Sequence, residues 1–407
     1  MSSSIPHSSG RSERVDSLGS SSLVWSATRD RNEPARYGRF RKSRLWPVFN
    51  VRARAPLRLG LAGGGTDLSP YCDEYGGAIL NATIDRFAFA HVFSNDASKI
   101  IFRARDVDQE ERLDPDVNLL VRQGLMLHRA VYAYVMKNYC GGRALPLVVS
   151  TAIDVPAGSG LGASSALVVA LIEAFRSALQ LPLGPYEVAR LAFEIERVDL
   201  GLAGGRQDQY AAVFGGLNYI EFLAQERVIV NPLRIRRDYL NEFESSLVVA
   251  FTGQSRRSDA IIKEQVSGLA ALNPDTIANM HALKRDAAEM KLALLTGKIR
   301  QVAEILSHSW AAKKKTAAGV SNARVEEMYD VAMQAGAWAG KVSGAGGGGF
   351  LMLMTDPENR YRLISRINQA GGQASAVKLT LEGAEGWTPR PESPRHDSDM
   401  IALASVG

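Results

Sequence analysis

Hydrophobic residues recur along residues 51–381 with two different periods. Alternating or continuous apolar runs predict strands over 51–61, 84–93, 99–103, 145–153, 246–252, 350–354 and 374–380. Apolar residues three and four positions apart predict helices over 118–139, 166–181, 186–198, 256–269, 275–295, 299–315, 323–335 and 357–370. Because strands and helices alternate in both halves without a long parallel repeat, we predict two α+β domains.

The same pattern divides the chain into segments. Residues 1–48 are rich in Ser and Arg and have no sustained period, so we predict a disordered basic leader. A start codon assigned too far upstream would also produce such a leader. The sequence pattern changes around residues 231–243, and we place the domain boundary there. This gives an N-terminal domain at 49–235 and a C-terminal domain at 236–382. The polar segment 383–407 is predicted to be a flexible tail.

The charge is unevenly distributed along the chain. The formal net charge is +5, and residues 1–50 account for all of it, with nine Lys and Arg against four Asp and Glu. A basic leader can bind a polyanion, and we favour the interpretation that it is simply solvated. Neither nucleic acid nor a membrane is an expected partner, because the body is neutral and no apolar run approaches ~18 residues.

Two further observations concern the cellular compartment. The N-terminus lacks the apolar core of a secretory signal. The two cysteines, Cys72 and Cys140, have neither the spacing of a metal site nor that of a disulfide framework. Both observations predict a protein of the reducing cytoplasm.

The segment 156–166 combines a glycine-rich turn with the start of a helix. Its glycines let the backbone turn tightly and bring N–H groups close to a ligand, and Ser164 or Ser165 is placed to cap the helix. Unpaired N–H donors and the positive end of a helix dipole together bind phosphate. The segment lacks the Gly-Lys-Ser/Thr of a P-loop and the glycine spacing of a dinucleotide fingerprint. A plain turn between strand and helix is the alternative.

Three glycine-rich segments lie far apart in the sequence, at residues 60–66, 158–165 and 344–349. Glycine is unfavourable in strands and helices, so three clusters indicate backbone that approaches a ligand closely. We therefore predict that the three segments meet at one ligand site. The alternative is that each segment is an ordinary turn.

These segments resemble the motifs of the GHMP kinases, a family of sugar and metabolite kinases. The motifs match, in order, residues 55–67, 156–166 and 341–349, and the resemblance covers about residues 51 to 381. It implies the two-domain fold of that family, with a ribosomal protein S5 domain 2-like N-terminal domain and a ferredoxin-like C-terminal domain. It also implies transfer of a phosphate group from ATP to an alcohol group, with Mg²⁺ as a cofactor.

Within the family, residues 62–67, followed by Tyr71-Cys72 and Gly76-Gly77, resemble the kinases of D-glycero-D-manno-heptose 7-phosphate. That subgroup implies phosphorylation of the anomeric C1 hydroxyl to the 1,7-bisphosphate, for nucleotide-activated heptose and capsule or surface polysaccharide. Two departures make other members poorer matches. Galactokinases carry Glu-His where this chain has Gly64-Gly65, and mevalonate kinases carry Lys where it has Arg58.

The resemblance also implies which residues hold ATP and Mg²⁺. The Ser165 hydroxyl and the Glu196 carboxylate would bind Mg²⁺, since hard oxygen ligands suit a hard cation. A solvent-facing Glu196 is the alternative, because Glu194 lies two residues away and only one of the two can point inward. The ATP phosphates would be held by Pro156, Gly158, Ser159, Gly160, Leu161, Gly162, Ala163, Ser164 and Ser165.

The acceptor hydroxyl would lie beside Asp208, which matches the family's aspartate acting as general base or orienting group. Arg58 matches the cation beside it, which would hold that carboxylate ionised and steady the developing charge. Capping a helix is the alternative for Asp208, and an exposed strand position is the alternative for Arg58. Asp67 would accept a sugar hydroxyl, or else cap the segment that begins at Leu68.

A sugar phosphate needs a second anion site. Thr252 and Arg256 lie at a helix start with small donors nearby, which suits a phosphate, and a solvated helix end is the alternative. The run Lys313–Lys315 is predicted to lie on the surface, and Lys341 is a lesser phosphate candidate. The predicted substrate residues are Gly63, Gly64, Gly65, Thr66, Asp67, Thr252, Arg256, Gly346 and Gly347.

These observations predict an ATP- and Mg²⁺-dependent sugar 1-kinase that acts on a small-molecule sugar phosphate, as a monomer or homodimer. A kinase for another sugar, such as fucose or a uronic acid, is the alternative among enzymes. A sugar sensor that kept the fold and lost the chemistry is the alternative of another class. The presence of Arg58, Ser165, Glu196 and Asp208 argues against the sensor.

Overall fold

A long antiparallel pair of strands, β1 (Asn50–Ala62) and β2 (Gly77–Ser94), forms the middle of the larger sheet. The computed structural model describes residues 49–94, 98–115, 122–254 and 259–390. The predicted leader, Arg256 and the tail beyond residue 390 lie outside those residues. The described residues belong to one compact unit.

The larger sheet is mixed but mostly antiparallel. Within the described residues it has eight strands, six of them in the order β12-β1-β2-β5-β3-β4. The first part of β2 also pairs with β6, which pairs with β7, and β3 runs parallel to β5. The bounds are β3 (Ile100–Ala104), β4 (Gln109–Leu113), β5 (Leu147–Ile153), β6 (Leu217–Phe222), β7 (Val228–Pro232) and β12 (Glu385–Trp387).

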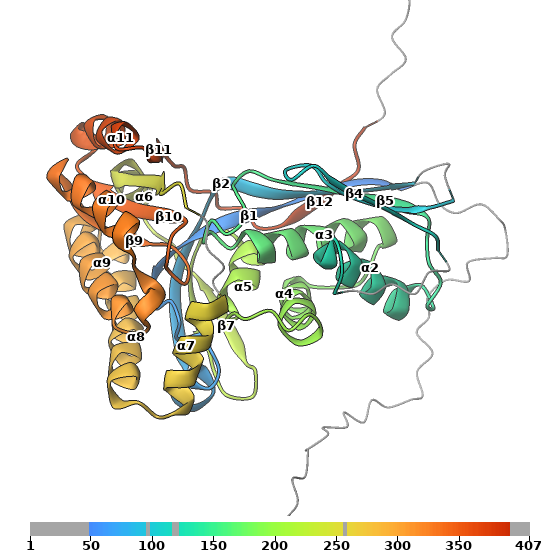
Figure 1. Cartoon of the computed structure of the whole chain (residues 1–407), viewed down its shortest axis with the longest axis horizontal. Helices are drawn as coiled ribbons and strands as arrows, with labels where there is room; N and C mark the ends of the chain where they lie inside the picture. The colour runs from blue at the N-terminus through green and yellow to red at the C-terminus, as the bar shows by residue number, and fades with distance from the viewer. Residues whose placement is uncertain (1–48, 95–97, 116–121, 255–258, 391–407) are drawn as a thin grey trace, which may run out of the picture. The chain divides into compact units, whose positions relative to one another are not determined.

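Helices α2 to α5 lie on one side of this sheet (Figure 1). Helix α3 packs on β1 and β2, because its residues from Ala166 to Phe175 are all buried and apolar except for Glu173. Helix α5 packs beside it on the same strands, and α2 and α4 pack on α3. The bounds are α1 (Tyr71–Tyr75), α2 (Met126–Tyr139), α3 (Ala163–Leu179), α4 (Pro185–Phe193), a π-helical turn (Glu194–Asp199) and α5 (Gln207–Phe214).

The smaller sheet is antiparallel, with the strand order β11-β8-β10-β9 in the described residues. The neighbouring helices α8 and α9 join the two sheets, because α9 contacts β9 while both contact β1. The strands are β8 (Leu247–Phe251), β9 (Ala337–Val342), β10 (Phe350–Thr355) and β11 (Gln373–Ala376). The helices are α6 (Arg237–Ser246), α7 (Asp259–Ala270), α8 (Pro274–Leu295), α9 (Ile299–Lys314), α10 (Ala323–Gln334) and α11 (Arg360–Gln369), with 3-10 turns at Ala318–Val320 and Pro357–Asn359.

The elements that the hydrophobic pattern missed are short or polar. Strand β4 reads Gln-Glu-Glu-Arg-Leu and lies at the edge of the sheet with its side chains largely in solvent, so it has no apolar alternation. Strand β2 starts at Gly77 rather than residue 84, and α2 starts at Met126 rather than residue 118. Local patterns fix the type of an element better than its ends.

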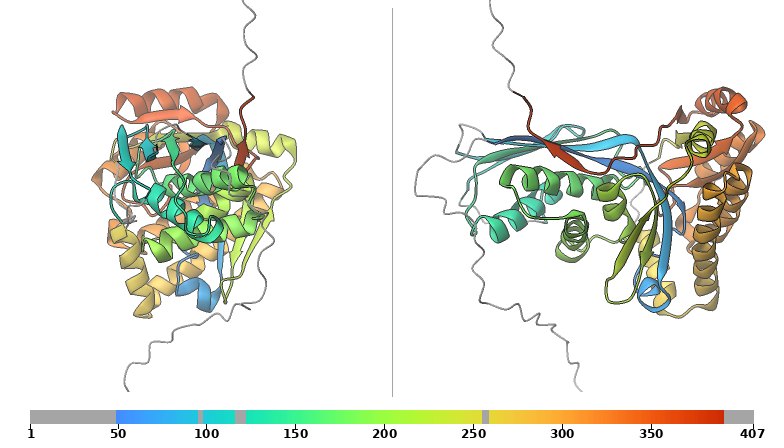
Figure 2. Two further views of the ribbon diagram at one scale, coloured as in Figure 1. Left: turned by 90° about the vertical axis from the view of Figure 1, so that its right-hand side faces the viewer. Right: turned by 180° about the vertical axis from the view of Figure 1, so that it is seen from behind.

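The expectation of a flexible tail from residue 383 is wrong for its first residues. Strand β12 pairs with the outer edge of β1, where Arg54 lies opposite Glu385 and donates to its carboxylate at 2.7 Å. Upstream, the Thr380 N–H donates to the Thr83 carbonyl at 3.1 Å. Figure 2 shows this C-terminal segment running along the larger sheet. The unpaired N–H and C=O groups of the β1 edge bind a polar strand as well as an apolar one.

The hydroxyl of Tyr132 fastens α2 to the segment before β5. Tyr132 is fully buried, and its hydroxyl donates to the Leu145 carbonyl at 2.8 Å and accepts from the Leu145 N–H at 2.7 Å. We expect Tyr132→Phe to lower the free energy of unfolding by about 1–3 kcal/mol, because two buried groups lose their partner. Denaturant unfolding measures this, with Tyr361→Phe as a control because Tyr361 is 84% exposed. A loss below about 0.5 kcal/mol, the usual effect of a surface substitution, contradicts the prediction.

Candidate active site

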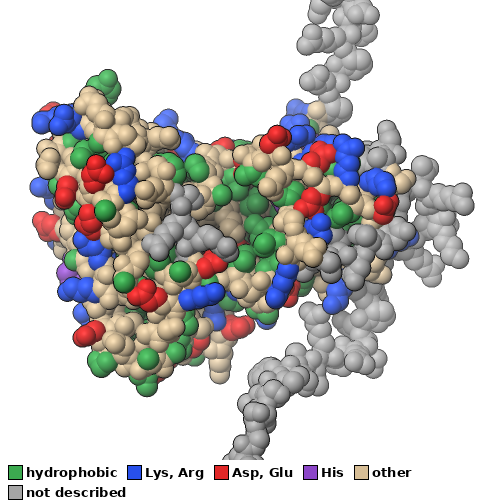
Figure 3. Space-filling view, in the orientation of Figure 1, with side chains coloured by type: hydrophobic (Ala, Val, Ile, Leu, Met, Phe, Trp, Pro, Cys, Tyr) green, Lys and Arg blue, Asp and Glu red, His purple; other side chains and the backbone are tan. Residues whose placement is uncertain are grey.

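A cavity of about 400 Å³ is lined by the starts of α3 and α5 and by one face of α7. Figure 3 shows the molecule hollowed beside the start of α3. All three glycine-rich segments reach the cavity, through Gly65 in the first, Gly158, Gly160 and Gly162 in the second, and Gly344 in the third. The three segments therefore share one site, as their glycine content predicts.

The second glycine segment leads directly into α3. The helix begins at Ala163, and its N-cap is Gly162, whose φ of 76° lies in the left-handed region that favours glycine. Ser164 and Ser165 therefore lie inside the first turn, and the expectation that one of them caps the helix is wrong. The first N–H groups of a helix have no helical partner, and the helix dipole adds positive potential there. This end of the cavity suits the phosphates of a nucleotide.

The second and third glycine segments pack backbone against backbone. The Phe350 N–H donates to the Ser159 carbonyl at 3.0 Å. A Cβ atom at Gly160 would lie 2.5 Å from the Ser343 carbonyl oxygen, so no side chain fits there. The glycine at this position permits the two segments to meet.

Only part of the third glycine segment lines the cavity. Gly344 and Ala345 are among the lining residues. Gly346 and Gly347, predicted to bind substrate, pack on Val320 instead, and the Gly347 N–H donates to the Val320 carbonyl at 2.7 Å. The turn that brings the segment to Gly160 directs these two glycines toward a neighbouring backbone.

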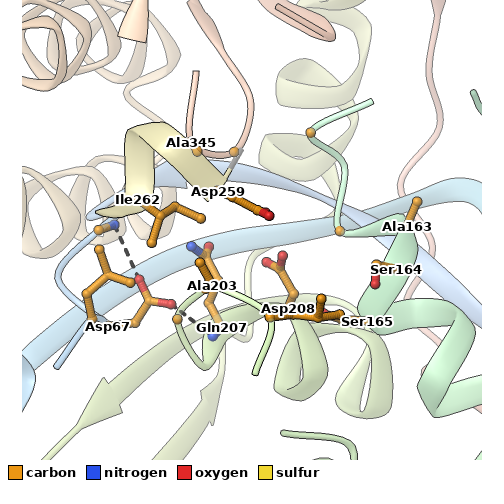
Figure 4. A pocket seen from close by; sticks show the side chains of 18 of the residues that line it. Asp67, Ala163, Ser164, Ser165, Ala203, Gln207, Asp208, Asp259, Ile262 and Ala345 are labelled. Atoms are coloured by element: carbon orange, nitrogen blue, oxygen red, sulfur yellow. Dashed lines mark hydrogen bonds between the residues drawn. The ribbon is translucent and has the colours of Figure 1, made fainter. Parts of the chain in front are cut away.

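Arg58 and Asp208 form an ion pair in the wall of the cavity. The Nε and Nη2 atoms of Arg58 both lie 2.7 Å from Asp208 Oδ1. The Nη1 atom donates to the Gly160 carbonyl at 2.7 Å and to Ser343 Oγ at 3.2 Å. Asp208 lies in the first turn of α5 without capping it, and its carboxylate faces the cavity (Figure 4). A fixed carboxylate in this place can take a proton or orient a hydroxyl.

Glu196, rather than Glu194, points into the protein. It is fully buried, and its Oε1 accepts from Ser164 Oγ at 2.7 Å while its Oε2 accepts from Gln209 Nε2 at 2.6 Å. The same Gln209 amide lies 3.1 Å from Ser165 Oγ. Glu194 forms an exposed ion pair with an arginine of α4. The buried carboxylate is therefore joined by hydrogen bonds to the start of α3.

The oxygens around Glu196 suit Mg²⁺. Carboxylate and hydroxyl oxygens are hard ligands, and Gln209 adds an Oε1 atom that is buried without a hydrogen-bond partner in the described residues. The described residues contain no group of three or more His, Cys, Asp or Glu that could hold a metal. Mg²⁺ in kinases uses one or two carboxylates and completes its shell with substrate phosphates and water. Ser165 and Glu196 fit that kind of site.

Asp67 lies at the other end of the cavity from Ser164 and Ser165 (Figure 4). Its Oδ2 accepts from the Gln207 N–H at 3.0 Å, and its Oδ1 accepts from the Gly65 N–H at 3.3 Å. Burial raises the pKa of this carboxyl. It does not cap a helix, because α1 begins four residues later after a proline N-cap. A buried carboxyl on the cavity wall suits acceptance of a sugar hydroxyl.

Lys313 is a cavity residue that the sequence analysis placed on the surface. It is 3% exposed, and its Nζ atom donates to the Gly64 carbonyl at 2.7 Å. Burial lowers the pKa of its ammonium to about 8. Lys313 follows the buried residues Leu306 and Trp310 by seven and three positions, so helical periodicity was the signal that could have found it.

Two further contributions to the cavity wall were also missed. Asp259, Ile262 and Gln265 reach it from one face of α7, and Arg197 reaches it from the π-helical turn. The Arg197 Nη2 atom lies 3.4 Å from Ser165 Oγ. Helical spacing places the α7 residues on one face, but nothing in their sequence marks that face as functional.

Several predicted residues lie close to the cavity without lining it. The Thr252 hydroxyl is buried and donates to the Gly349 carbonyl at 3.0 Å, so it has no proton to give to a phosphate. The Lys341 ammonium donates to the Leu61 carbonyl at 3.3 Å, and burial lowers its pKa to about 7. Glu196 also lies outside the lining and reaches it through its hydrogen bond with Ser164. The remaining predicted residues outside the lining are Pro156, Leu161, Gly63, Gly64 and Thr66.

Comparisons with known proteins identify the family. Models of the GHMP kinases N terminal domain and of the GHMP kinases C terminal match residues 126–216 and 290–373. The chain is 42% identical over 337 residues to the D-glycero-alpha-D-manno-heptose 7-phosphate kinase of Campylobacter jejuni, which covers 83% of this chain and 98% of that protein. The chain belongs to the GHMP kinases.

Solved structures of two sugar kinases have the same fold. A D-glycero-D-manno-heptose 1-phosphate kinase from Bacteroides thetaiotaomicron is 40% identical and superposes with a TM-score of 0.70, over 84% of this chain and 100% of that chain. Galactokinase from Lactococcus lactis superposes with a TM-score of 0.63 over 83% of this chain and 95% of that chain. At 16% identity this second likeness shows the fold alone. The predicted two-domain GHMP kinase fold is confirmed, and the structure shows two sheets in it.

Membership in the family also confirms the predicted class, an ATP-dependent sugar kinase. The two matched segments fall on either side of the predicted domain boundary at residue 235, and the boundary itself stays a prediction. Among the described helices, none combines the length and apolarity needed to cross a membrane.

Proposed function

We propose that this GHMP kinase transfers the γ-phosphate of ATP to the C1 hydroxyl of D-glycero-D-manno-heptose 7-phosphate. The product is the 1,7-bisphosphate, a precursor of nucleotide-activated heptose for surface polysaccharide. The observation that carries the proposal is the place of Asp208, fixed by Arg58 at 2.7 Å between the nucleotide end of the cavity and Asp67. The relative from Campylobacter jejuni supports the choice of sugar.

Phosphoryl transfer needs a hydroxyl placed in line with the γ-phosphate and little covalent help from the protein. The N–H groups at the start of α3 hold the nucleotide phosphates, and Asp67 accepts a sugar hydroxyl at the opposite end. The C1 oxygen bonds to the γ-phosphorus while the bond from that phosphorus to the β–γ bridging oxygen breaks. The hydroxyl proton passes to Asp208, and the bridging oxygen leaves with ADP.

Arg58 fixes both the base and the phosphate-binding turn. Two of its nitrogens bind Asp208 Oδ1, and among the described residues Oδ2 has no hydrogen-bond partner, which makes Oδ2 the oxygen that accepts the proton. A third nitrogen binds the Gly160 carbonyl. One guanidinium therefore keeps the carboxylate and the nucleotide phosphates in register, which is the positioning that this reaction requires.

Ser165 and Glu196 are the residues that would hold Mg²⁺. When bound with ATP, the ion neutralises charge on the phosphates. Ser164 and Gln209 orient the Glu196 carboxylate, with hydrogen bonds of 2.7 and 2.6 Å to its two oxygens. Outer residues of this kind fix the direction in which a ligand presents its lone pairs.

Release of ADP with Mg·ATP tests the proposal against a panel of acceptors. The panel contains the heptose 7-phosphate, the heptose 1-phosphate, the free heptose, L-fucose and a uronic acid. Both phosphates are included because the two similar kinases are named for different positions of the phosphate. We expect turnover with the 7-phosphate to exceed that with every other acceptor by at least about 10²-fold.

Other outcomes of the panel show which part of the proposal is wrong. Turnover with the 1-phosphate alone keeps the kinase and overturns the acceptor position. Turnover with L-fucose or the uronic acid alone overturns the heptose assignment. No turnover with any acceptor, although ATP binds, overturns the catalytic proposal in favour of a sugar sensor.

A further inference from the structure

A buried ammonium at the acceptor end of the cavity has no carboxylate in direct contact among the described residues. Lys313 is 3% exposed. Within the described residues, its Nζ atom donates one hydrogen bond, to the Gly64 carbonyl at 2.7 Å, and forms no ion pair. A buried charge that forms no ion pair is costly to the folded state. An ammonium has three N–H donors and no lone pair, so the group that completes it must be an acceptor, and an anion suits it best.

The other cations in the described lining are already engaged. Arg58 gives two nitrogens to Asp208 and a third to Gly160. The Nη2 atom of Arg197 lies 3.4 Å from Ser165 Oγ, at the nucleotide end. Lys313 lies at the opposite end, where the described wall offers no second ammonium.

The neighbours of Lys313 place it on the acceptor side. A Cβ atom at Gly65 would lie 3.4 Å from its Nζ, so the first glycine segment leaves room for this ammonium to reach the cavity. Asp67, which suits a sugar hydroxyl, is the nearby carboxyl whose charge acts on the ammonium. A sugar held by Asp67 therefore has Lys313 beside it.

We propose that Lys313 binds the phosphate group that the acceptor sugar already carries. The inference rests on the proposed function and adds to it the residue that selects a phosphorylated acceptor over a free sugar. A phosphate monoester carries nearly two negative charges and three acceptor oxygens. These can accept from the two N–H groups of the ammonium that do not bind Gly64. Thr252, predicted earlier for this role, gives its hydroxyl proton to Gly349 instead.

The charges around Lys313 agree with a ligand-binding role. Burial lowers its pKa to about 8, Asp67 raises it, and Arg58 lowers it, while the charge of Lys341 on β9 is also coupled to it. Because this pKa lies below the usual 10.5, the unfolded chain binds more protons than the folded protein between pH 8 and 10.5. The buried ammonium therefore lowers the free energy of unfolding, with its full effect below pH 8. This effect disappears as the pH rises to 10.5. Groups that weaken the fold in this way are typical of binding sites.

Lys313→Met tests the inference, because methionine keeps the length of the side chain and removes its charge. With the full chain and saturating Mg·ATP, we expect KM for the heptose 7-phosphate to rise about 10²-fold and KM for ATP to change less than about threefold. The preference for the 7-phosphate over the free heptose should collapse, while the melting temperature does not fall. The control is Lys314→Met, whose exposed ammonium pairs with Glu326 at 3.2 Å.

The pH profile gives a second readout. With the 7-phosphate, kcat/KM of the wild type should fall as the pH rises through about 8, the pKa of the free enzyme's Lys313, and Lys313→Met should lack this fall. The acceptor phosphate is already fully ionised there, because its second pKa is about 6.

The other outcomes show whether the inference fails alone or together with the proposed function. The phosphate contact is overturned, and the kinase activity is not, if Lys313→Met loses the same factor in kcat/KM with the 7-phosphate and with the free heptose. The same holds if KM for ATP rises as much as KM for the 7-phosphate. A lowered melting temperature with unchanged acceptor preference assigns Lys313 a structural role. If the wild type uses only unphosphorylated acceptors, both proposals fail together. If it uses a different sugar phosphate, the same comparison is made with that acceptor and its free sugar.

Discussion

Asp208→Asn is expected to lower kcat by about 10³-fold while KM for ATP changes by less than about threefold. The amide keeps the shape of the side chain but cannot accept the hydroxyl proton. It also replaces the ion pair with Arg58, at 2.7 Å, by a contact between the charged guanidinium and a neutral amide. Steady-state release of ADP with the heptose 7-phosphate measures kcat, and retained ATP binding shows that the nucleotide end is intact.

Asp238→Asn is the matched control, since Asp238 pairs with Arg236 at the surface and should leave kcat unchanged. Arg58→Met and the double variant complete the set. Residues that act as one unit give non-additive losses, so the double variant should lose little more than Asp208→Asn alone. Additive losses, or a kcat within tenfold of the wild type for Asp208→Asn, contradict the role of Asp208 as the base.

Glu196→Gln is expected to lower kcat/KM for Mg·ATP by about 10²-fold, the usual effect of weakening a metal site. The substitution removes a negative charge from a fully buried position. It also sets an amide NH₂ against the donors of Ser164 and Gln209, which approach the two carboxylate oxygens at 2.7 and 2.6 Å. Kinetics at increasing Mg²⁺ measure the loss, and we expect the variant to need more Mg²⁺ for half-maximal rate.

Glu194→Gln is a close control because Glu194 lies on the same π-helical turn and forms an exposed ion pair. A readout without turnover is the shift of the melting temperature by Mg²⁺ and ADP. Ligand at about 100 Kd adds roughly 2.7 kcal/mol to wild-type stability, and Glu196→Gln should lose most of that gain. Equal shifts for both variants would exclude Glu196 as a ligand.

The glycine segments explain why much of the site could be predicted from sequence. At Gly160 and Gly162 the constraint acts on the backbone, because a Cβ atom at Gly160 would lie 2.5 Å from the Ser343 carbonyl oxygen and Gly162 has a φ of 76°. Such constraints appear in the sequence as the residue itself. The charges of Asp208 and Arg58 likewise appear as residue types next to recognisable motifs. The strands and helices with strong periods were predictable for the same reason.

The rest depends on contacts between distant segments. Glu196 is buried through a π-helical turn, in which the Leu200 N–H donates to the Ile195 carbonyl, and no sequence signal marks that extra residue per turn. Lys313 sits in a run of three lysines, and only its position relative to Trp310 distinguishes it from its neighbours. Strand β12 has too few residues to show a period.

The pairing of β12 with β1 also has a consequence for the chain during its synthesis on the ribosome. Arg54 and Glu385 are separated by 331 residues, so a ribosome working at about 5–20 residues per second needs roughly 15–65 s to supply the partner of this edge. During that time β1 presents open backbone groups to other nascent chains and to chaperones. Arg52 and Arg54 lie along the edge, and their charges discourage such pairing until the last strand arrives.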